Sequence, residues 1–214
     1  MNSNQLTCGF STCTERMHSA SPLLPKVNIT NDEINALPLR AYEGEIIVIS
    51  DPDQLASAFK EISKHTLVGF DTETRPAFVK GQQYKVALIQ IALPAKVFLI
   101  KLQSTGMTDE IIDFLQNESI AKAGVAVRDD IKALQRLKPY TPGGFVELAL
   151  MSKQAGLEVE SVKKLTALLL GFRISKTAQT SNWEAEVLNE KQISYAATDA
   201  WACLEIYKKL KALR

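Results

Sequence analysis

Two carboxylates stand two residues apart at the end of an apolar run. Residues 67–70 (LVGF) predict a buried strand, and Asp71 and Glu73 follow it directly. Side chains at positions i and i+2 of a strand point to the same face. Two like charges ~4 Å apart repel by roughly 4 kcal/mol at an effective dielectric of ~20, and a divalent cation such as Mg²⁺ or Mn²⁺, which takes oxygen ligands, would remove that cost. A strand that runs out into a solvated acidic turn explains the same pattern, so this segment alone leaves both interpretations open.

A tyrosine and a third carboxylate share one face of a predicted helix. Tyr195 and Asp199 lie four residues apart within residues 190–210, whose pattern predicts a long amphipathic helix. Small residues next to them, Ala196 and Ala200 among others, would let another element come close. A carboxylate in such an apolar setting needs a partner. That partner is either a cation or a neighbouring backbone group.

A pair of aspartates stands between a predicted strand, residues 121–127, and a helix predicted over residues 130–137. We expect Asp129 to cap the N-terminus of the helix, without a chemical role. Asp130 then lies in the first turn, where the helix dipole favours a negative charge. Dipole complementation alone would explain Asp130, and a role as a metal ligand is the alternative.

The remaining patterns predict the elements that must bring these side chains together. Apolar and β-branched runs predict strands over residues 45–50, 86–92, 97–101, 121–127 and 145–148. The second and third of these form a hairpin or meander beside the strand that carries Asp71. Helices are predicted after a capping box at Thr30, after Asp51-Pro52, and over residues 107–116, 130–137, 162–170 and 190–210. This order predicts one α/β domain with a mixed sheet flanked by helices.

The composition is that of an ordinary globular protein of 214 residues, with 46% hydrophobic and 23% charged residues. No apolar run approaches the ~20 residues that a membrane span needs. The N-terminus also lacks a basic region followed by an apolar core, so we expect a cytoplasmic protein that binds no membrane. The net charge of +1 gives no global basic field, and contacts with nucleic acid must therefore come from local residues and metal ions.

Few cysteines and histidines are present, which narrows the chemistry. Cys8, Cys13 and Cys203 form an odd set that we expect to be free thiols. A zinc site at Cys8, Cys13 and His18 is disfavoured because the spacing matches no standard pattern and a fourth ligand is missing. The other histidine, His65, falls in a predicted turn, so catalysis by a Ser–His or Cys–His pair is not expected. Residues 1–26 lack periodicity and predict a flexible tail, which leaves residues 27–214 as a single domain.

Taken together, the carboxylate motifs resemble those of a known family of enzymes. A DxE strand, a strand-to-helix aspartate and a helical YxxxD occur in the order found in the DEDD superfamily of 3′→5′ exonucleases, and the tyrosine marks its Tyr-containing branch. The segments FDTETRP, KAGVAVRDDIKAL, SNWE and QISYAATDAWA are similar to ribonuclease D and to Werner-type exonuclease domains. The resemblance covers residues ~45–210.

This resemblance implies a ribonuclease H-like fold and a metal-dependent exonuclease that releases nucleoside 5′-monophosphates from single-stranded or frayed 3′ ends of DNA or RNA. It implies two divalent cations, Mg²⁺ or Mn²⁺, with Asp71 bridging both, Glu73 and Asp199 on the first, and Asp130 holding the second largely through water. Tyr195 is a poor general base at neutral pH, because a phenol has a pKa of ~10, so we expect it to orient the attacking water. A nucleic-acid-binding domain that kept the fold but lost turnover is the alternative, and an endonuclease of the same fold is a third possibility.

Six further residues are candidate contacts to the nucleic acid. Trp183 could stack on a base, although a tryptophan in a loop is more often a packing residue. Arg75 could meet a phosphate or simply be a solvated turn residue, and Arg128 could do the same beside Asp130. The full set of candidate contacts is Thr74, Arg75, Arg128, Lys176, Asn182 and Trp183.

Overall fold

A computed structural model describes Met1 and residues 26–77, 81–82 and 84–213. The flexible tail predicted over residues 1–26, with Cys8, Cys13 and His18, lies almost entirely outside these described residues. Among the described residues, no helix combines the length and the apolar character that a membrane crossing requires.

The described residues form a six-stranded mixed sheet in the order β1-β4-β3-β2-β5-β6. Strand β2 pairs antiparallel with β3, and β3 with β4, which confirms the predicted hairpin beside the carboxylate strand. The pairs β1–β4, β2–β5 and β5–β6 are parallel. The strands span Glu45–Ile49 (β1), Leu67–Thr74 (β2), Val86–Ala92 (β3), Lys96–Lys101 (β4), Ala121–Gly124 (β5) and Phe145–Glu147 (β6).

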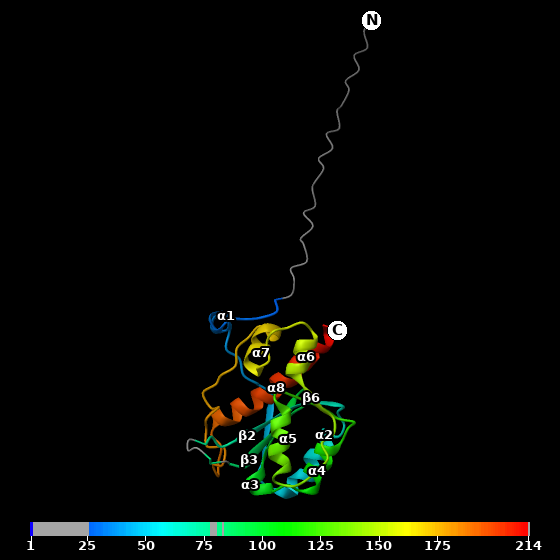
Figure 1. The fold of residues 1–214 in the computed structure, drawn as a ribbon, viewed down its shortest axis with the longest axis vertical. Helices are drawn as coiled ribbons and strands as arrows, with labels where there is room; N and C mark the ends of the chain where they lie inside the picture. Colours follow the sequence, from blue (N-terminus) through cyan, green and yellow to red (C-terminus); the bar gives the residue numbers. More distant parts are fainter. Residues whose placement is uncertain (2–25, 78–80, 83, 214) are drawn as a thin grey trace.

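Helices flank the sheet, as the sequence predicted, and the structure shows that they cover both of its faces. On one face, α2, α4 and α5 pack over Phe70 and Ile89. On the other, α8 packs over Leu88 and Leu99. Figure 1 shows α8 crossing the sheet, with α1, α6 and α7 gathered at one end of the molecule. The helices span Asn31–Ala36 (α1), Leu55–Ile62 (α2), Leu102–Thr105 (α3), Asp109–Gln116 (α4), Val127–Gln135 (α5), Leu148–Gln154 (α6), Val162–Leu170 (α7) and Glu190–Ala212 (α8), with a 3₁₀ turn at Pro52–Gln54.

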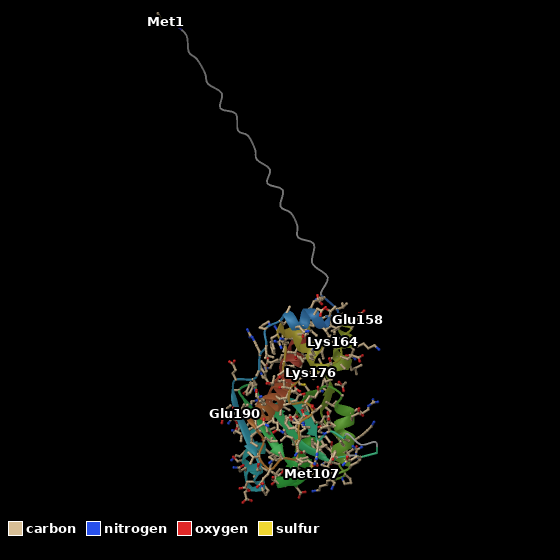
Figure 2. The ribbon with its side chains drawn as sticks, turned by 90° about the vertical axis from the view of Figure 1, so that its left-hand side faces the viewer. Met1, Met107, Glu158, Lys164, Lys176 and Glu190 are labelled. Carbon is tan, nitrogen blue, oxygen red and sulfur yellow. The ribbon has the colours of Figure 1, made fainter. Side chains whose placement is uncertain are left out.

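Local capping signals account for several helix ends. Thr30 and Glu33 form the predicted capping box of α1. Gly171 ends α7 with a φ of 74°, a left-handed conformation that glycine adopts without strain. In Figure 2, Glu158 and Lys164 lie at the end of the folded part of the chain where α7 lies, and Met107 lies at the opposite end.

The predicted N-cap of α5 was wrong. The helix begins at Val127, so Asp129 lies within its first turn instead of before it. The chain turns at Ala126, whose φ is 59°, and the side chain of Glu147 accepts hydrogen bonds from the backbone N–H groups of Ala126 and Val127, each at 3.0 Å. Because this capping carboxylate arrives from β6, twenty residues further along the chain, the local pattern around Asp129 could not reveal it.

Candidate metal centre

Three of the predicted carboxylates converge at one end of β2. Asp71 and Glu73 on β2 and Asp199 on α8 each offer a carboxylate oxygen, and these oxygens lie within 4.8 Å of one another. They line a cavity of about 280 Å³ that is bounded by β2, α8, the start of α7 and the segment of residues 174–179. Asp71 and Glu73, two residues apart on the strand, therefore lie beside Tyr195 and Asp199, four residues apart on the helix, as the sequence predicted.

The local electrostatics oppose full ionisation of this cluster. Burial, followed by the charges of Asp199 and Asp130, raises the pKa of Asp71 well above its ordinary value. Burial and the neighbouring aspartates raise the pKa of Glu73 to about 10. Burial also raises the pKa of Asp199 to about 7, although a hydrogen bond from Tyr195 and the charge of Lys176 act in the opposite direction. In the absence of cations, protons must therefore compensate part of the negative charge at neutral pH.

The donor set fits a hard divalent cation. Asp199 is only 7% exposed, and its Oδ1 atom is buried without a hydrogen-bond partner. A buried acceptor without a partner is costly, and here it stands beside two further carboxylates. Carboxylate oxygens are the ligands that Mg²⁺ and Mn²⁺ prefer. Asp71, Glu73 and Asp199 would hold such an ion.

Asp130 approaches the cluster from the other face of the sheet. It lies in the first turns of α5 and is not one of the three carboxylates that meet within 4.8 Å. Its Oδ1 accepts a hydrogen bond of 2.6 Å from the hydroxyl of Thr72. Burial raises its pKa to about 6 while this hydrogen bond lowers it, and its charge raises the pKa of both Asp71 and Glu73. The charge of Asp130 therefore acts on the other carboxylates, although its side chain comes from α5 and not from β2 or α8.

The phenol of Tyr195 stays protonated in this setting. Burial, then the charges of Asp199 and Glu73, raise its pKa above the ordinary value of 10. A protonated phenol can donate a hydrogen bond but cannot take a proton as a general base. The ring also lies against Trp183, with 6.0 Å between ring centroids. The role of Tyr195 in orienting the attacking water stays a prediction.

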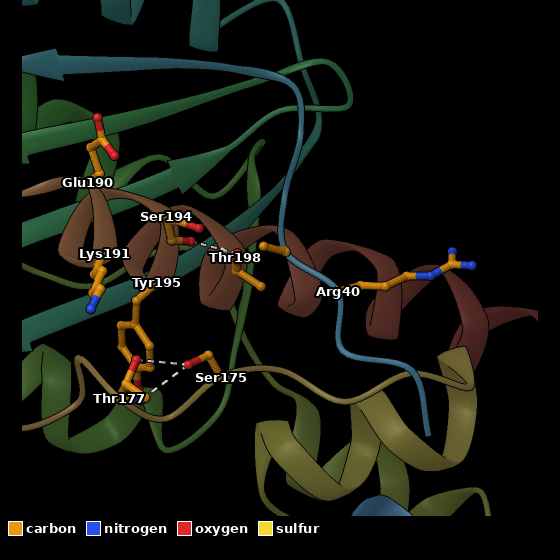
Figure 3. A pocket seen from close by; sticks show the side chains of 9 residues that line it. Arg40, Ser175, Thr177, Glu190, Lys191, Ser194, Tyr195 and Thr198 are labelled. Atoms are coloured by element: carbon orange, nitrogen blue, oxygen red, sulfur yellow. Dashed lines mark hydrogen bonds between the residues drawn. The ribbon is translucent and has the colours of Figure 1, made fainter. Parts of the chain in front are cut away.

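Tyr195 also lines a second cavity, of about 210 Å³, on the side of α8 where residues 40–41 cross it. Figure 3 shows Ser175 and Thr177 beside the ring of Tyr195, with a hydrogen bond between their hydroxyl groups, while the side chain of Arg40 points away from them. Asp71, Glu73 and Asp199 are not among the residues that line this cavity. Tyr195 and Ser175 line both cavities, but the carboxylate cluster belongs to the first.

The predicted nucleic-acid contacts divide into two groups. Lys176 lines the carboxylate cavity. Trp183 is 1% exposed and packs within the cluster beneath α8, which favours the packing interpretation over base stacking. Arg75 forms an ion pair with Glu184 at 3.2 Å and lies over the ring of Tyr84. The cavity lining does not include Thr74, Arg75, Arg128, Asn182 or Trp183.

The contribution of α7 to the cavity was not predicted from the sequence. Ser161, Val162 and Lys163 at the start of this helix form part of its wall, and Gln179 forms another part. Ser161 caps α7, because its side-chain hydroxyl accepts a hydrogen bond from the backbone N–H of Lys164. Its place beside the carboxylates depends on how α7 packs against α8, which no local pattern encodes.

Comparison with known proteins identifies the family. A family model described as 3′-5′ exonuclease matches residues 46–213. The chain belongs to this 3′-5′ exonuclease family. The assignment agrees with the DEDD motifs in the sequence, and the matched residues include Asp71, Glu73, Asp130, Tyr195 and Asp199.

Relatives and solved structures agree with this assignment. The bifunctional 3′-5′ exonuclease/ATP-dependent helicase WRN of Mus musculus is 33% identical over 184 residues, which are 81% of this chain but 13% of that protein. The Nibbler EXO domain of Aedes aegypti matches with a TM-score of 0.69 at 24% identity and covers 83% of this chain and 92% of that one. Escherichia coli RNase D matches with a TM-score of 0.71 at 22% identity and covers 80% of this chain and 45% of that one. These two likenesses confirm the ribonuclease H-like fold, and the exonuclease domain described here spans less than two thirds of the length of the curated relatives that it matches.

Proposed function

We propose that this exonuclease domain is catalytically active and removes nucleotides one at a time from the 3′ end of single-stranded or frayed nucleic acid. The observation that carries the proposal is the meeting of Asp71, Glu73 and Asp199 within 4.8 Å, with a buried oxygen of Asp199 that has no hydrogen-bond partner. Such an arrangement is costly for stability alone, because like charges repel. A cation site for chemistry at phosphorus explains why these three carboxylates are kept together.

Two divalent cations, Mg²⁺ or Mn²⁺, are the cofactors that this donor set would take. Asp71, Glu73 and Asp199 would hold the first ion, and Asp130 would help to hold the second, largely through water. Bound there, the cations supply charge neutralisation at the phosphoryl group and make a water molecule more acidic. The protein itself holds the geometry: β2 and α8 fix the three clustered carboxylates relative to one another.

Tyr195 and Lys176 complete the proposed active site. The protonated phenol of Tyr195 orients the attacking water or an oxygen of the scissile phosphate by donating a hydrogen bond. The ammonium group of Lys176, at the rim of the same cavity, contributes positive charge for the nucleic-acid backbone. We keep Thr74, Arg75, Arg128 and Asn182 as proposed contacts further along the strand, and the cytoplasmic location stays a prediction.

A cleavage assay with labelled oligonucleotides tests this proposal. Purified protein is incubated with Mg²⁺ or Mn²⁺ and with RNA and DNA of the same sequence, labelled at either the 5′ or the 3′ end. A 3′→5′ exonuclease gives a descending ladder from the 5′ label and releases the 3′ label at once as a mononucleotide. The Asp199→Asn variant, which keeps the shape of the side chain, serves as the matched inactive control.

Three other outcomes would contradict the proposal in different ways. Cleavage of a circular oligonucleotide would show an endonuclease. Binding of RNA or DNA without any cleavage would support the non-catalytic alternative. Equal turnover by the wild type and by Asp199→Asn would show that the carboxylate cluster is not the active site.

A further inference from the structure

The residue between the two carboxylates of the DxE motif faces the opposite side of the sheet. Thr72 pairs across the strands with Ile89, which belongs to the core beneath α2, α4 and α5. Asp71 and Glu73 pair with Gln90 and Leu88, on the face that α8 covers. Residue alternation along a strand requires this arrangement. Strand β2 therefore places polar side chains on both faces of the sheet.

Thr72 touches two of the proposed metal carboxylates at once. Its backbone N–H donates to Oδ1 of Asp71 at 2.9 Å. Its hydroxyl donates to Oδ1 of Asp130 at 2.6 Å, across 58 positions of sequence. That separation lies in the range of hydrogen bonds from a hydroxyl to an ionised carboxylate, which are stronger than those between neutral groups. Thr72 thus connects the two aspartates: it follows Asp71 directly in the chain, and its hydroxyl binds Asp130 by a hydrogen bond.

Asp130 needs such a link more than the other carboxylates do. Asp71 and Glu73 are fixed by the same strand, and α8, which carries Asp199, packs along that strand. Asp130 comes from the start of α5, a helix that begins after a sharp turn at Ala126. Its like charge repels Asp71, and the hydroxyl of Thr72 is a neutral donor that holds Asp130 in place without competing for the cations. A carboxylate has two oxygens, so this bond leaves the second one for other partners.

We propose that Thr72 is a positioning residue, which fixes the carboxylate of Asp130 relative to Asp71 and so sets the affinity of the site for its second divalent cation. The proposal rests on the proposed exonuclease function. In the alternative interpretation, Thr72 is simply a β-branched residue that favours the strand. The two interpretations differ only in the hydroxyl, because valine has the same shape and the same preference for strands, and serine keeps the hydroxyl.

Three variants separate these interpretations. Thr72→Val removes the hydroxyl and keeps the shape, Thr72→Ser restores it, and Thr66→Val removes an exposed hydroxyl just before the same strand as a control. The dependence of nucleotide release on Mn²⁺ concentration is measured for each. We expect Thr72→Val to raise the Mn²⁺ concentration for half-maximal rate about tenfold, the size expected for losing one hydrogen bond to a charged group, while Thr72→Ser and Thr66→Val stay near the wild type.

Two further measurements do not depend on turnover. Mn²⁺ binding is titrated calorimetrically, and Thr72→Val is expected to weaken the weaker of two binding events and to leave the tighter one unchanged. Urea unfolding in EDTA is measured for Thr72→Val, Asp130→Asn and the double variant, and the effects of the two single changes are expected not to add. Thr72→Ala replaces Thr72→Val in each measurement if the valine variant does not fold.

Additive unfolding effects together with unchanged Mn²⁺ binding in Thr72→Val would overturn the proposal, and so would a serine variant as impaired as the valine variant. If the wild type degrades oligonucleotides and Thr72→Val matches it at every Mn²⁺ concentration, the positioning role fails and the exonuclease function stands. If the wild type is inactive, the exonuclease function fails, and the calorimetric and unfolding measurements still decide the role of Thr72.

Discussion

Gly69 on β2 packs directly against the backbone of Ala200 on α8. A Cβ atom at position 69 would lie 1.9 Å from the carbonyl oxygen of Ala200, a separation that real Cβ atoms essentially never show, and 3.0 Å from Cβ of Leu204. Asp71 lies two residues after Gly69, and Asp199 lies one residue before Ala200. This close approach of strand and helix is therefore what brings the carboxylates of Asp71 and Asp199 together.

The first prediction concerns this contact. Gly69→Ala must push α8 away from β2 and is expected to cost roughly 1–3 kcal/mol of stability or more. Because Asp199 moves with the helix, the variant should also lose most of its stabilisation by Mn²⁺. Gly171→Ala is the matched control: its φ of 74° makes alanine unfavourable by about 1–2 kcal/mol, but nothing lies within 4 Å of the new Cβ. Thermal melts with and without Mn²⁺ measure both effects, and a normal Mn²⁺ response in Gly69→Ala would contradict this account.

The second prediction concerns the pH dependence of the metal-free protein. Burial raises the folded-state pKa of Asp199 to about 7 and that of Asp130 to about 6, and the charges of Asp129 and Glu147 add to the rise at Asp130. The folded state therefore binds more protons than the unfolded chain between pH ~4 and ~7, so these groups favour folding at the acidic end and lose that contribution as the pH rises. In EDTA, the stability of the wild type relative to an Asp71→Asn/Asp199→Asn double variant should fall across this window.

Saturating Mn²⁺ should reverse this trend, because a cation that binds the ionised carboxylates competes with protons. Urea denaturation at several pH values, in EDTA and in Mn²⁺, measures the difference between wild type and double variant. A difference that stays constant with pH in EDTA would show that the cluster is not strained by its own charge.

The third prediction separates two neighbouring aspartates. Asp129 is exposed and pairs only weakly with Lys132 at 3.6 Å, so Asp129→Asn should be nearly silent. Asp130→Asn removes a charge that acts on Asp71, and it should lower the rate by about 10–100-fold, the range typical of groups that act on a bound metal from outside its immediate ligands. Rates of nucleotide release for the two variants, with melting curves to verify folding, make the comparison. The reverse order of effects would exclude the proposed role of Asp130.

The fourth prediction concerns Tyr195. Tyr195→Phe keeps the ring, which packs against Trp183, and removes only the hydroxyl. We expect turnover to fall ~10²–10⁴-fold, as is typical when a proton-transferring or water-orienting group is lost, while binding of Mn²⁺ and of an oligonucleotide stays near the wild type. Single-turnover kinetics and a binding titration separate these effects. A rate within twofold of the wild type would show that the tyrosine is only structural.

The sequence predicted the parts of the site that depend on short spacings. The alternation of a strand placed Asp71 and Glu73 on one face, and the turn of a helix placed Tyr195 and Asp199 on one face, because both periods are fixed by backbone geometry. The order of the strands and helices predicted a mixed sheet flanked by helices. Gly69 lies in the apolar run, but the reason why glycine is required there, the close approach of α8, cannot be predicted without the position of that helix.

Contacts between segments distant in sequence were not predictable in the same way. The cap of α5 comes from Glu147 on β6, so the assignment of Asp129 as the cap failed although an aspartate in that place is a common cap. The position of Lys163 in the wall of the carboxylate cavity depends on the packing of α7. The hydrogen bond from Thr72 to Asp130 spans 58 positions of sequence and joins β2 to the start of α5. Only the assembled fold shows these relationships.

Binding of Mn²⁺ to the folded protein is the most direct test of the central claim, that the four carboxylates form a divalent-cation site. An ion that binds only the folded state stabilises it by about 2.7 kcal/mol at a hundredfold excess over Kd, which for a domain of this size raises the melting temperature by roughly 5–11 °C. We predict a rise of this size between EDTA and millimolar Mn²⁺ in the wild type, and a much smaller one in Asp71→Asn. Identical midpoints of the wild type in EDTA and in Mn²⁺ would contradict a preformed metal site.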